Sequence, residues 1–167
     1  TPSAEEQIRL VRAQMIEPAE VWVWVNDVEE NRDFDFDTLD ADKVFRASHN
    51  MRYHGRFALG LLARTTYVAF FDDDTMPGDL WFNTCLDSMA NKEGIQVGVG
   101  VLLKGKSYFP HSLTGWPAKG KGQKDTIECD LGGHAWFLKR EHLNYMWYET
   151  PWDFDNCEDI QLSYFAL

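Results

Sequence analysis

Apolar residues recur at two different spacings along the chain, and these spacings predict its first elements. Ile8, Val11 and Met15 follow one another at helical spacing, and Pro18 is expected to end this helix because proline cannot continue one. Within residues 20–27 valine alternates with tryptophan, so both faces of the predicted strand are apolar. A strand of this kind is typical of a central position in a parallel sheet.

The same patterns continue along the chain and predict strands that alternate with helices. Further strands are expected at 43–47, 65–71, 95–103 and 128–138, and further helices at 55–63, from 77 onward, at 140–148 and at 158–167. This alternation predicts an α/β fold with a mainly parallel sheet flanked by helices. A doubly wound sheet usually begins with a strand, whereas this chain opens on a helix, so we expect the first strand to be missing.

Composition limits the classes of function. The 167 residues fit a single domain, and 44% hydrophobic residues are enough for a buried core. Sixteen Lys and Arg against 27 Asp and Glu give a net charge of −11. This charge argues against a nucleic-acid or anionic-membrane partner, because both need a basic surface. No apolar run reaches the roughly 18 residues of a membrane span, and no signal peptide is visible.

The number and spacing of the cysteines indicate in which cellular compartment the protein resides. Cys85, Cys129 and Cys157 are widely spaced and odd in number, a pattern that indicates neither a disulfide framework nor a zinc site. We therefore expect a domain of a reducing compartment, the cytoplasm. A lumenal catalytic domain of a longer protein would have the same features, so that alternative stays open.

Three consecutive carboxylates, Asp72, Asp73 and Asp74, follow the apolar strand predicted at 65–71. In open α/β sheets ligands bind at the carboxyl ends of the strands, which is where this triplet is expected. Extended backbone sends Asp72 and Asp74 to the same side, and a divalent cation would relieve their repulsion. Carboxylate oxygens suit Mn²⁺ or Mg²⁺, so the triplet predicts a metal site. The alternative is a solvated acidic turn that caps the next helix.

A second pair of carboxylates, Glu158 and Asp159, is predicted at the N-terminus of the last helix. The helix dipole favours negative charge there, so one alternative is a purely structural helix start capped by Asp155 or Asn156. Combined with the aspartate triplet, the pair indicates a division of labour. One centre would hold a metal, and the other would act on the reacting groups.

The segment around Gly133 offers groups suited to binding a ligand. Two successive glycines, followed by His134, let a ligand approach the backbone closely. His134 would supply a polar contact and Trp136 a stacking face for a sugar. The alternatives are a histidine that only makes structural hydrogen bonds and a tryptophan in the core.

Two further segments carry candidate binding residues. Asn26 and Asp27 end the tryptophan-rich strand at the same sheet edge as the triplet, where Asp27 would accept from a base or ribose. Arg56 precedes a helix and would pair with a diphosphate in bidentate fashion. A simple turn and a simple salt bridge are the alternatives. Residues 104–124, with five Lys and no acid, are expected to be a long loop that closes over the site.

In combination these segments resemble a GT-A glycosyltransferase, the nucleotide-sugar-dependent fold with an Asp-x-Asp motif. The likeness is to exostosin-like transferases and to the large inverting family 2. It rests on residues 26–27, 55–57, 72–74, 132–135 and 156–160. The resemblance implies transfer of a sugar from a nucleotide donor, expected to be UDP-linked, to a hydroxyl group of a glycan or glycoprotein. It also implies Mn²⁺ or Mg²⁺ as cofactor.

The resemblance implies roles for individual residues. Asp74 and Asp72 would bind the metal, and Asp159 or Glu158 would deprotonate the acceptor hydroxyl or face the anomeric carbon. The donor would contact Asn26, Asp27, Arg56, Asp72, Asp73, Gly133 and His134. Because the expected first strand is absent and the chain ends just after the Glu-Asp helix, residues 1–167 are expected to be one catalytic domain of a longer protein.

Other functions are compatible with the acidic segments. An aspartate-based phosphatase would carry threonine or valine where this chain has Met76, and a nucleotidyltransferase would carry a Gly-rich phosphate loop near its N-terminus. A metal-dependent carbohydrate-binding module would explain the acids and aromatics without a use for Glu158 and Asp159. The donor sugar, the acceptor, the stereochemistry and the oligomeric state stay open.

Overall fold

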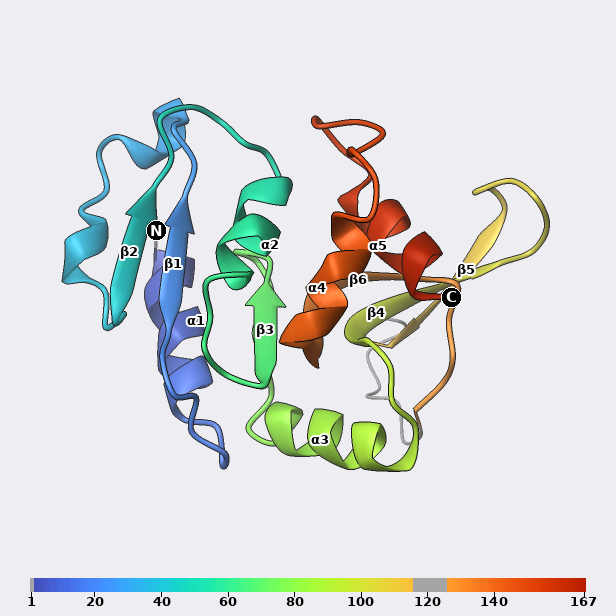
Figure 1. Ribbon diagram of the computed structural model, residues 1–167. Helices are drawn as coiled ribbons and strands as arrows, with labels where there is room; N and C mark the ends of the chain where they lie inside the picture. The colour runs from blue at the N-terminus through green and yellow to red at the C-terminus, as the bar shows by residue number, and fades with distance from the viewer. Residues whose placement is uncertain (1, 116–125) are drawn as a thin grey trace.

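The computed structural model describes residues 2–115 and 126–167 and is a mixed α/β structure (Figure 1). Its helices are α1 (Pro2–Arg12), α2 (His54–Gly60), α3 (Trp81–Asn91), α4 (Leu143–Met146) and α5 (Glu158–Ala166). Its strands are β1 (Trp22–Val25), β2 (Lys43–Arg46), β3 (Tyr67–Phe71), β4 (Gln96–Leu103), β5 (His111–Gly115) and β6 (Leu131–Lys139). Short 3-10 turns lie at Glu29–Asn31, Phe36–Thr38 and, directly before α4, Arg140–His142. The predicted mixture of helices and strands is thus confirmed.

The strands form two sheets, and this corrects the expectation of a mainly parallel sheet. β1 pairs with β2 in parallel, whereas β3, β6, β4 and β5 follow one another in antiparallel pairs. The crossover through α3 does leave β3 and β4 parallel to each other, because both are antiparallel to β6. The order of elements along the chain cannot reveal that a later strand inserts between two earlier ones. That insertion makes the larger sheet antiparallel.

One strand lies in a segment predicted as a loop. Within residues 104–124, β5 pairs with β4 as a hairpin, from His111 opposite Leu103 to Gly115 opposite Val99. The segment is rich in lysine and glycine, and this composition predicts a loop and gives no sign of the short strand. Residues 116–125 of the predicted lid lie outside the described part of the chain.

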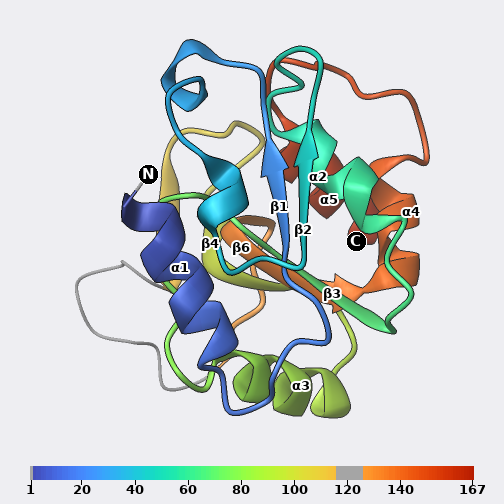
Figure 2. The same cartoon turned by 90° about the vertical axis from the view of Figure 1, so that its left-hand side faces the viewer.

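Helices cover both faces of the strands, with α1 on one side and α2, α4 and α5 on the other (Figure 2). The core on the α1 side consists of Ile8, Val11, Val21, Val25, Phe36, Leu39, Phe82, Cys85, Met89 and Phe137. The core on the opposite side consists of Phe57, Phe70, Trp136, Leu138, Leu143, Met146 and Leu162. β3 and β6 contribute side chains to both cores, which explains why their sequences are apolar at successive positions.

The first helix ends at Arg12, earlier than the predicted stop at Pro18, and the side chain of Gln14 just beyond it bonds to the start of α3. The Gln14 amide nitrogen donates to the carbonyl of Gly78 at 2.8 Å, and its amide oxygen accepts from the backbone N–H of Phe82 at 3.2 Å. This buried side chain connects the end of α1 to the start of α3. The connection holds both helices on the same face of the strands.

Two further features bear on the expectations from composition. In residues 2–115 and 126–167, no helix is long and apolar enough to cross a membrane. The three cysteines are free thiols, and burial raises the pKa of Cys85 in α3 to about 12. Cys85 therefore stays protonated and serves as an apolar residue of the core.

A methyl group added at Gly132 is expected to destabilise the protein by about 1–3 kcal/mol, because it would overlap the side chain of Val97. An ideal Cβ at Gly132 would lie only 2.9 Å from Cβ of Val97 and would also overlap its Cγ1. No atom of the described residues lies within 4 Å of the corresponding position at Gly133, so Gly133→Ala is the matched control. Urea unfolding measures both variants. The steric account is wrong if Val97→Ala in the same chain does not rescue Gly132→Ala.

Candidate functional site

The candidate site lies where β3 ends and the chain turns toward α3. The backbone N–H of Asp72 donates to the carbonyl of His134 at 2.8 Å, which holds the first aspartate beside β6. From α1, the amide nitrogen of Gln7 donates to the carbonyls of Asp72 and Thr75, at 2.5 and 2.7 Å. Sequence reasoning had no signal for Gln7, a polar residue of an amphipathic helix. Its two hydrogen bonds hold the turn that carries the aspartate triplet.

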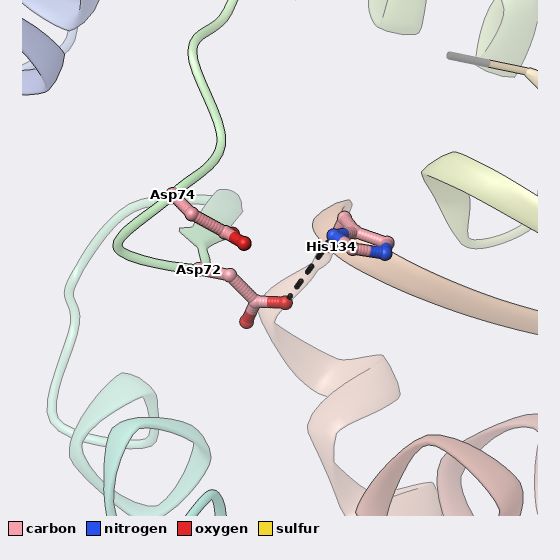
Figure 3. Close-up of side chains that lie close together, drawn as sticks. All are labelled: Asp72, Asp74 and His134. Carbon is pink, nitrogen blue, oxygen red and sulfur yellow. Dashed lines mark ion pairs between the residues drawn. The ribbon is translucent and has the colours of Figure 1, made fainter. Parts of the chain in front are cut away.

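Asp72, Asp74 and His134 bring their side chains together at this point (Figure 3). One potential ligand atom from each lies within 4.8 Å of the other two, and His134 Nδ1 is 3.9 Å from Asp72 Oδ2. Two carboxylates and an imidazole suit Mn²⁺, and the carboxylates also suit Mg²⁺. These residues therefore fit the predicted divalent cation. His134, predicted only to bind the donor, joins them as a candidate ligand.

Arg56 connects this cluster to the start of α5. Its Nη1 donates to Asp72 Oδ1 at 2.5 Å, and its Nη2 lies 3.6 Å from Glu158 Oε1. The guanidinium carbon lies 4.9 Å from the ring centroid of Trp136, which supplies a cation–π contact. The Nε and Nη2 atoms are buried without a hydrogen-bond partner among the described residues. Arg56 thus has two buried donor atoms whose hydrogen-bonding capacity the described residues do not satisfy.

Burial raises the pKa of three carboxyl groups around Arg56, those of Asp72, Glu158 and Asp159. Removal from water is the largest cause in each case, and the positive charge of Arg56 lowers the pKa of all three. One guanidinium faces the buried carboxyl group of Glu158 and the partly buried ones of Asp72 and Asp159. A further cation would therefore relieve an excess of negative charge at this end of the sheet.

Within residues 2–115 and 126–167, three residues other than glycine have a positive φ, and each belongs to a segment that leads into or forms this site. Arg52 (φ 49°) precedes the helix that carries Arg56, and Cys157 (φ 69°) directly precedes Glu158. The third is His134 itself (φ 67°). Left-handed backbone is unfavourable for residues with a side chain, and such strain gathers at functional sites. Three separate segments therefore adopt strained backbone around the same few side chains.

Asn26 was predicted to bind the donor, but its side chain makes structural hydrogen bonds within the protein. Its amide oxygen accepts from Trp24 Nε1 at 3.1 Å and from the backbone N–H of Met51 at 3.0 Å. Its amide nitrogen donates to the carbonyl of Arg52 at 2.9 Å. Asn26 thus positions the segment that leads into Arg56.

Three other predicted donor-binding residues lie outside the cluster. Asp27 is exposed, with its carboxylate 4.0 Å from the guanidinium of Arg32. Asp73 is also exposed and lines a large cavity between β1 and β3. Gly133 has open space where a side chain would stand, which leaves its backbone accessible beside His134.

The two acidic residues at the start of α5 differ in orientation. Asp159 Oδ1 accepts from the backbone N–H of Ile160 at 2.8 Å, so this carboxylate bonds to the first turn of its own helix. Glu158 is buried and faces the cluster through Arg56. Trp136, considered as a sugar-stacking face, is only 2% exposed and belongs to the core.

A second group of potential ligands lies away from this site. Glu93, Glu141 and His142 bring one ligand atom each within 4.8 Å of the others. The ammonium group of Lys139 lies 2.7 Å from Glu93, and His142 Nε2 lies 3.2 Å from the same carboxylate. Because a lysine already supplies the positive charge, we assign no metal to this group.

No protein-family model matches the chain, and a search of curated proteins finds none with significant similarity. The likeness to GT-A glycosyltransferases therefore remains a resemblance of short segments. Function is inferred from the residues and geometry of the site.

Proposed function

We propose that this chain is the catalytic domain of a metal-dependent glycosyltransferase that uses a nucleotide-sugar donor, UDP-linked in the first instance. One observation carries the proposal: the cluster of Asp72, Asp74 and His134 is joined through Arg56 to the buried carboxylate of Glu158. A cation position beside a separate carboxylate suits the two tasks of glycosyl transfer. These are to neutralise a departing diphosphate and to activate an acceptor hydroxyl.

The residues of the site would divide these tasks. Asp72, Asp74 and His134 would hold Mn²⁺ or Mg²⁺, which when bound supplies positive charge to the diphosphate leaving group. Glu158 is suited to accept the proton of a hydroxyl on a glycan or glycoprotein, because burial raises its pKa above the ordinary value of a glutamate and so makes it a stronger base. Arg56 would hold both carboxylates in place and offer its remaining donors to the diphosphate.

A GT-A arrangement is the finer part of the proposal. In its support, the arrows of β1, β2 and β3 point the same way, and the aspartate triplet follows the carboxyl end of β3 (Figure 1). Ligands of open α/β sheets bind at such strand ends. The antiparallel pairing of β3, β6, β4 and β5 in the larger sheet does not support this assignment.

A thermal-shift screen tests the function directly. A UDP-sugar that binds with Mn²⁺ should raise the midpoint temperature by about 5 °C or more at 100 times its Kd, since saturation stabilises only the folded state. The same donor without Mn²⁺ should give no shift. Metal-dependent release of UDP from that donor would then report turnover. Equal shifts with and without metal, or none with any nucleotide sugar, would contradict the proposal.

A carbohydrate-binding module is the second candidate, favoured by a group of exposed aromatic rings. Trp152 packs edge-on against Tyr164 with ring centroids 5.3 Å apart, and both are more than half exposed. Exposed aromatic faces of this kind are suited to sugar rings. Sugar binding that needs no nucleotide would favour this candidate, whereas phosphate release from simple phosphomonoesters would favour a phosphatase.

A further inference from the structure

Aromatic side chains form a cluster on α5 and on the loop 147–157 that leads into it (Figure 1). The ring centroid of Trp152 lies 5.3 Å from that of Tyr164 and 5.7 Å from that of Phe165. Tyr148 completes the cluster, with its ring centroid 5.3 Å from that of Phe165. In the described part of the chain, Tyr148, Trp152 and Tyr164 are 74%, 51% and 61% exposed. We call this cluster the aromatic platform.

One buried side chain holds the platform in place. Gln161 of α5 is 1% exposed, and its amide oxygen accepts from the backbone N–H of Trp152 at 3.0 Å. Its amide nitrogen donates to the carbonyl of Met146, the last residue of α4, at 2.8 Å. The backbone of Trp152 is therefore fixed relative to both helices. A side chain on a fixed backbone loses less freedom when a ligand binds to it.

The platform lies next to the candidate base. Glu158 and Gln161 are both buried, and their spacing of three residues places them on one side of α5, about 5 Å apart along its axis. The carboxylate of Glu158 lies 3.6 Å from Arg56 of α2. The loop also contacts α2, because Phe154 packs against His54 with ring centroids 5.7 Å apart. The same loop thus connects the platform to the helices that carry Glu158 and Arg56.

The surroundings of the platform are acidic. Residues 143–167 contain acidic side chains but no Lys, Arg or His. Two of the acids, Glu149 and Asp153, are exposed and directly follow Tyr148 and Trp152 in the chain. Because like charges repel, this surface disfavours a glycan that carries carboxylate or sulfate groups. An uncharged sugar can place its C–H face on an aromatic ring and donate its hydroxyl groups to the carboxylates.

We propose that the aromatic platform binds the acceptor as an uncharged glycan, with one sugar ring stacked on Trp152. This assignment rests on the proposed function, and it adds the chemical class of the acceptor and the surface that recognises it. Glu149 and Asp153 would accept hydrogen bonds from the hydroxyl groups of the stacked sugar. Gln161 would act as a positioning residue through the backbone of Trp152. A glycan bound in this way would extend along α5 toward Glu158.

Titration with glycans, followed by nuclear magnetic resonance, tests the proposal. The probes are neutral hexasaccharides of glucose, mannose, galactose and N-acetylglucosamine, and hexagalacturonate is their acidic counterpart. At least one neutral chain should bind with a Kd of about 1 mM or less and shift the indole N–H signal of Trp152. Hexagalacturonate should bind more weakly by about 10-fold or more, because the acidic surroundings repel it.

Two substitutions of Trp152 separate ring stacking from general apolar contact. Trp152→Leu keeps an apolar side chain but removes the flat ring, so the Kd for the neutral glycan should rise by about 10-fold or more. Trp152→Phe keeps a ring, and its Kd should stay within about threefold of the parent value. Because Trp152 is half exposed, both variants should keep the fold, which urea unfolding checks.

The outcomes separate the possible occupants of the platform. Equal affinity of Trp152→Leu and the parent overturns the proposal, as does hexagalacturonate binding as tight as that of the neutral chains. Absence of binding by every neutral chain also overturns it. Shifts of the Trp152 signal that grow with protein concentration alone would assign the platform to a second copy of the chain and would likewise overturn it.

The thermal shift with UDP-sugars, measured on the same chain, distinguishes failure of this inference from failure of the proposed function. Metal-dependent donor binding without glycan binding would contradict the acceptor surface alone. Glycan binding on the platform without any donor binding would identify a carbohydrate-binding module, which contradicts both.

Discussion

Replacement of Asp74 by asparagine is expected to lower the metal-dependent kcat/KM for a UDP-sugar by about 10²–10³-fold. Asparagine keeps the shape of the side chain but removes the negative charge and one of the two carboxylates that would hold the cation. Asp74 is exposed, and its recorded side-chain hydrogen bond is a long one of 3.4 Å from Thr75. The folded protein should therefore keep its stability while it loses activity and Mn²⁺ binding.

The control for this experiment is Asp79→Asn, an exposed aspartate just before α3 that lies outside the cluster. It removes the same charge from the same part of the sequence and should leave activity within about twofold. Mn²⁺ affinity is measured by calorimetry, and turnover is measured by release of UDP. Full activity in Asp74→Asn, or the same loss in Asp79→Asn, would show that general surface charge and not metal ligation matters.

The aspartate triplet could be placed from the sequence because its signal is local. An apolar run that stops at three acids predicts a strand end, and Asp72 does follow β3 directly. The same holds for Glu158, which starts α5 as the pattern of acids before an apolar run predicts. Predictions from such local patterns hold in the folded protein because they depend only on residues that are neighbours in the chain.

The contacts that assemble the site could not be predicted in this way. Arg56 meets Asp72 across 16 residues and Glu158 across roughly a hundred, so their proximity depends on how α2 and α5 pack on the strands. His134 faces the aspartates only because β6 inserts beside β3 and its backbone takes a left-handed conformation. Periodicity contains no information about either event, because both are decided by tertiary packing.

Arg56→Met is expected to destabilise the protein by about 3 kcal/mol at pH 7.5, since it leaves buried carboxylates without their partner. Methionine keeps apolar contact with Trp136, whose ring lies under the guanidinium. Asp72 and Glu158 have a raised pKa in the folded state, mainly through burial. Their contribution to stability is present below the ordinary carboxyl pKa near 4 and is lost as pH rises through the raised value.

Removal of Arg56 raises these pKa values further, because Arg56 lowers both. The loss of unfolding free energy in Arg56→Met relative to the parent should therefore be largest at pH 7–8. It should shrink to about 1 kcal/mol near pH 4.5. Urea unfolding at both pH values measures it. Arg52→Met is the control, because its ion pair with Asp155 is solvent-exposed and should contribute less than about 0.5 kcal/mol. A deficit of Arg56→Met that does not change with pH would show that Arg56 acts through packing alone, with no charge compensation.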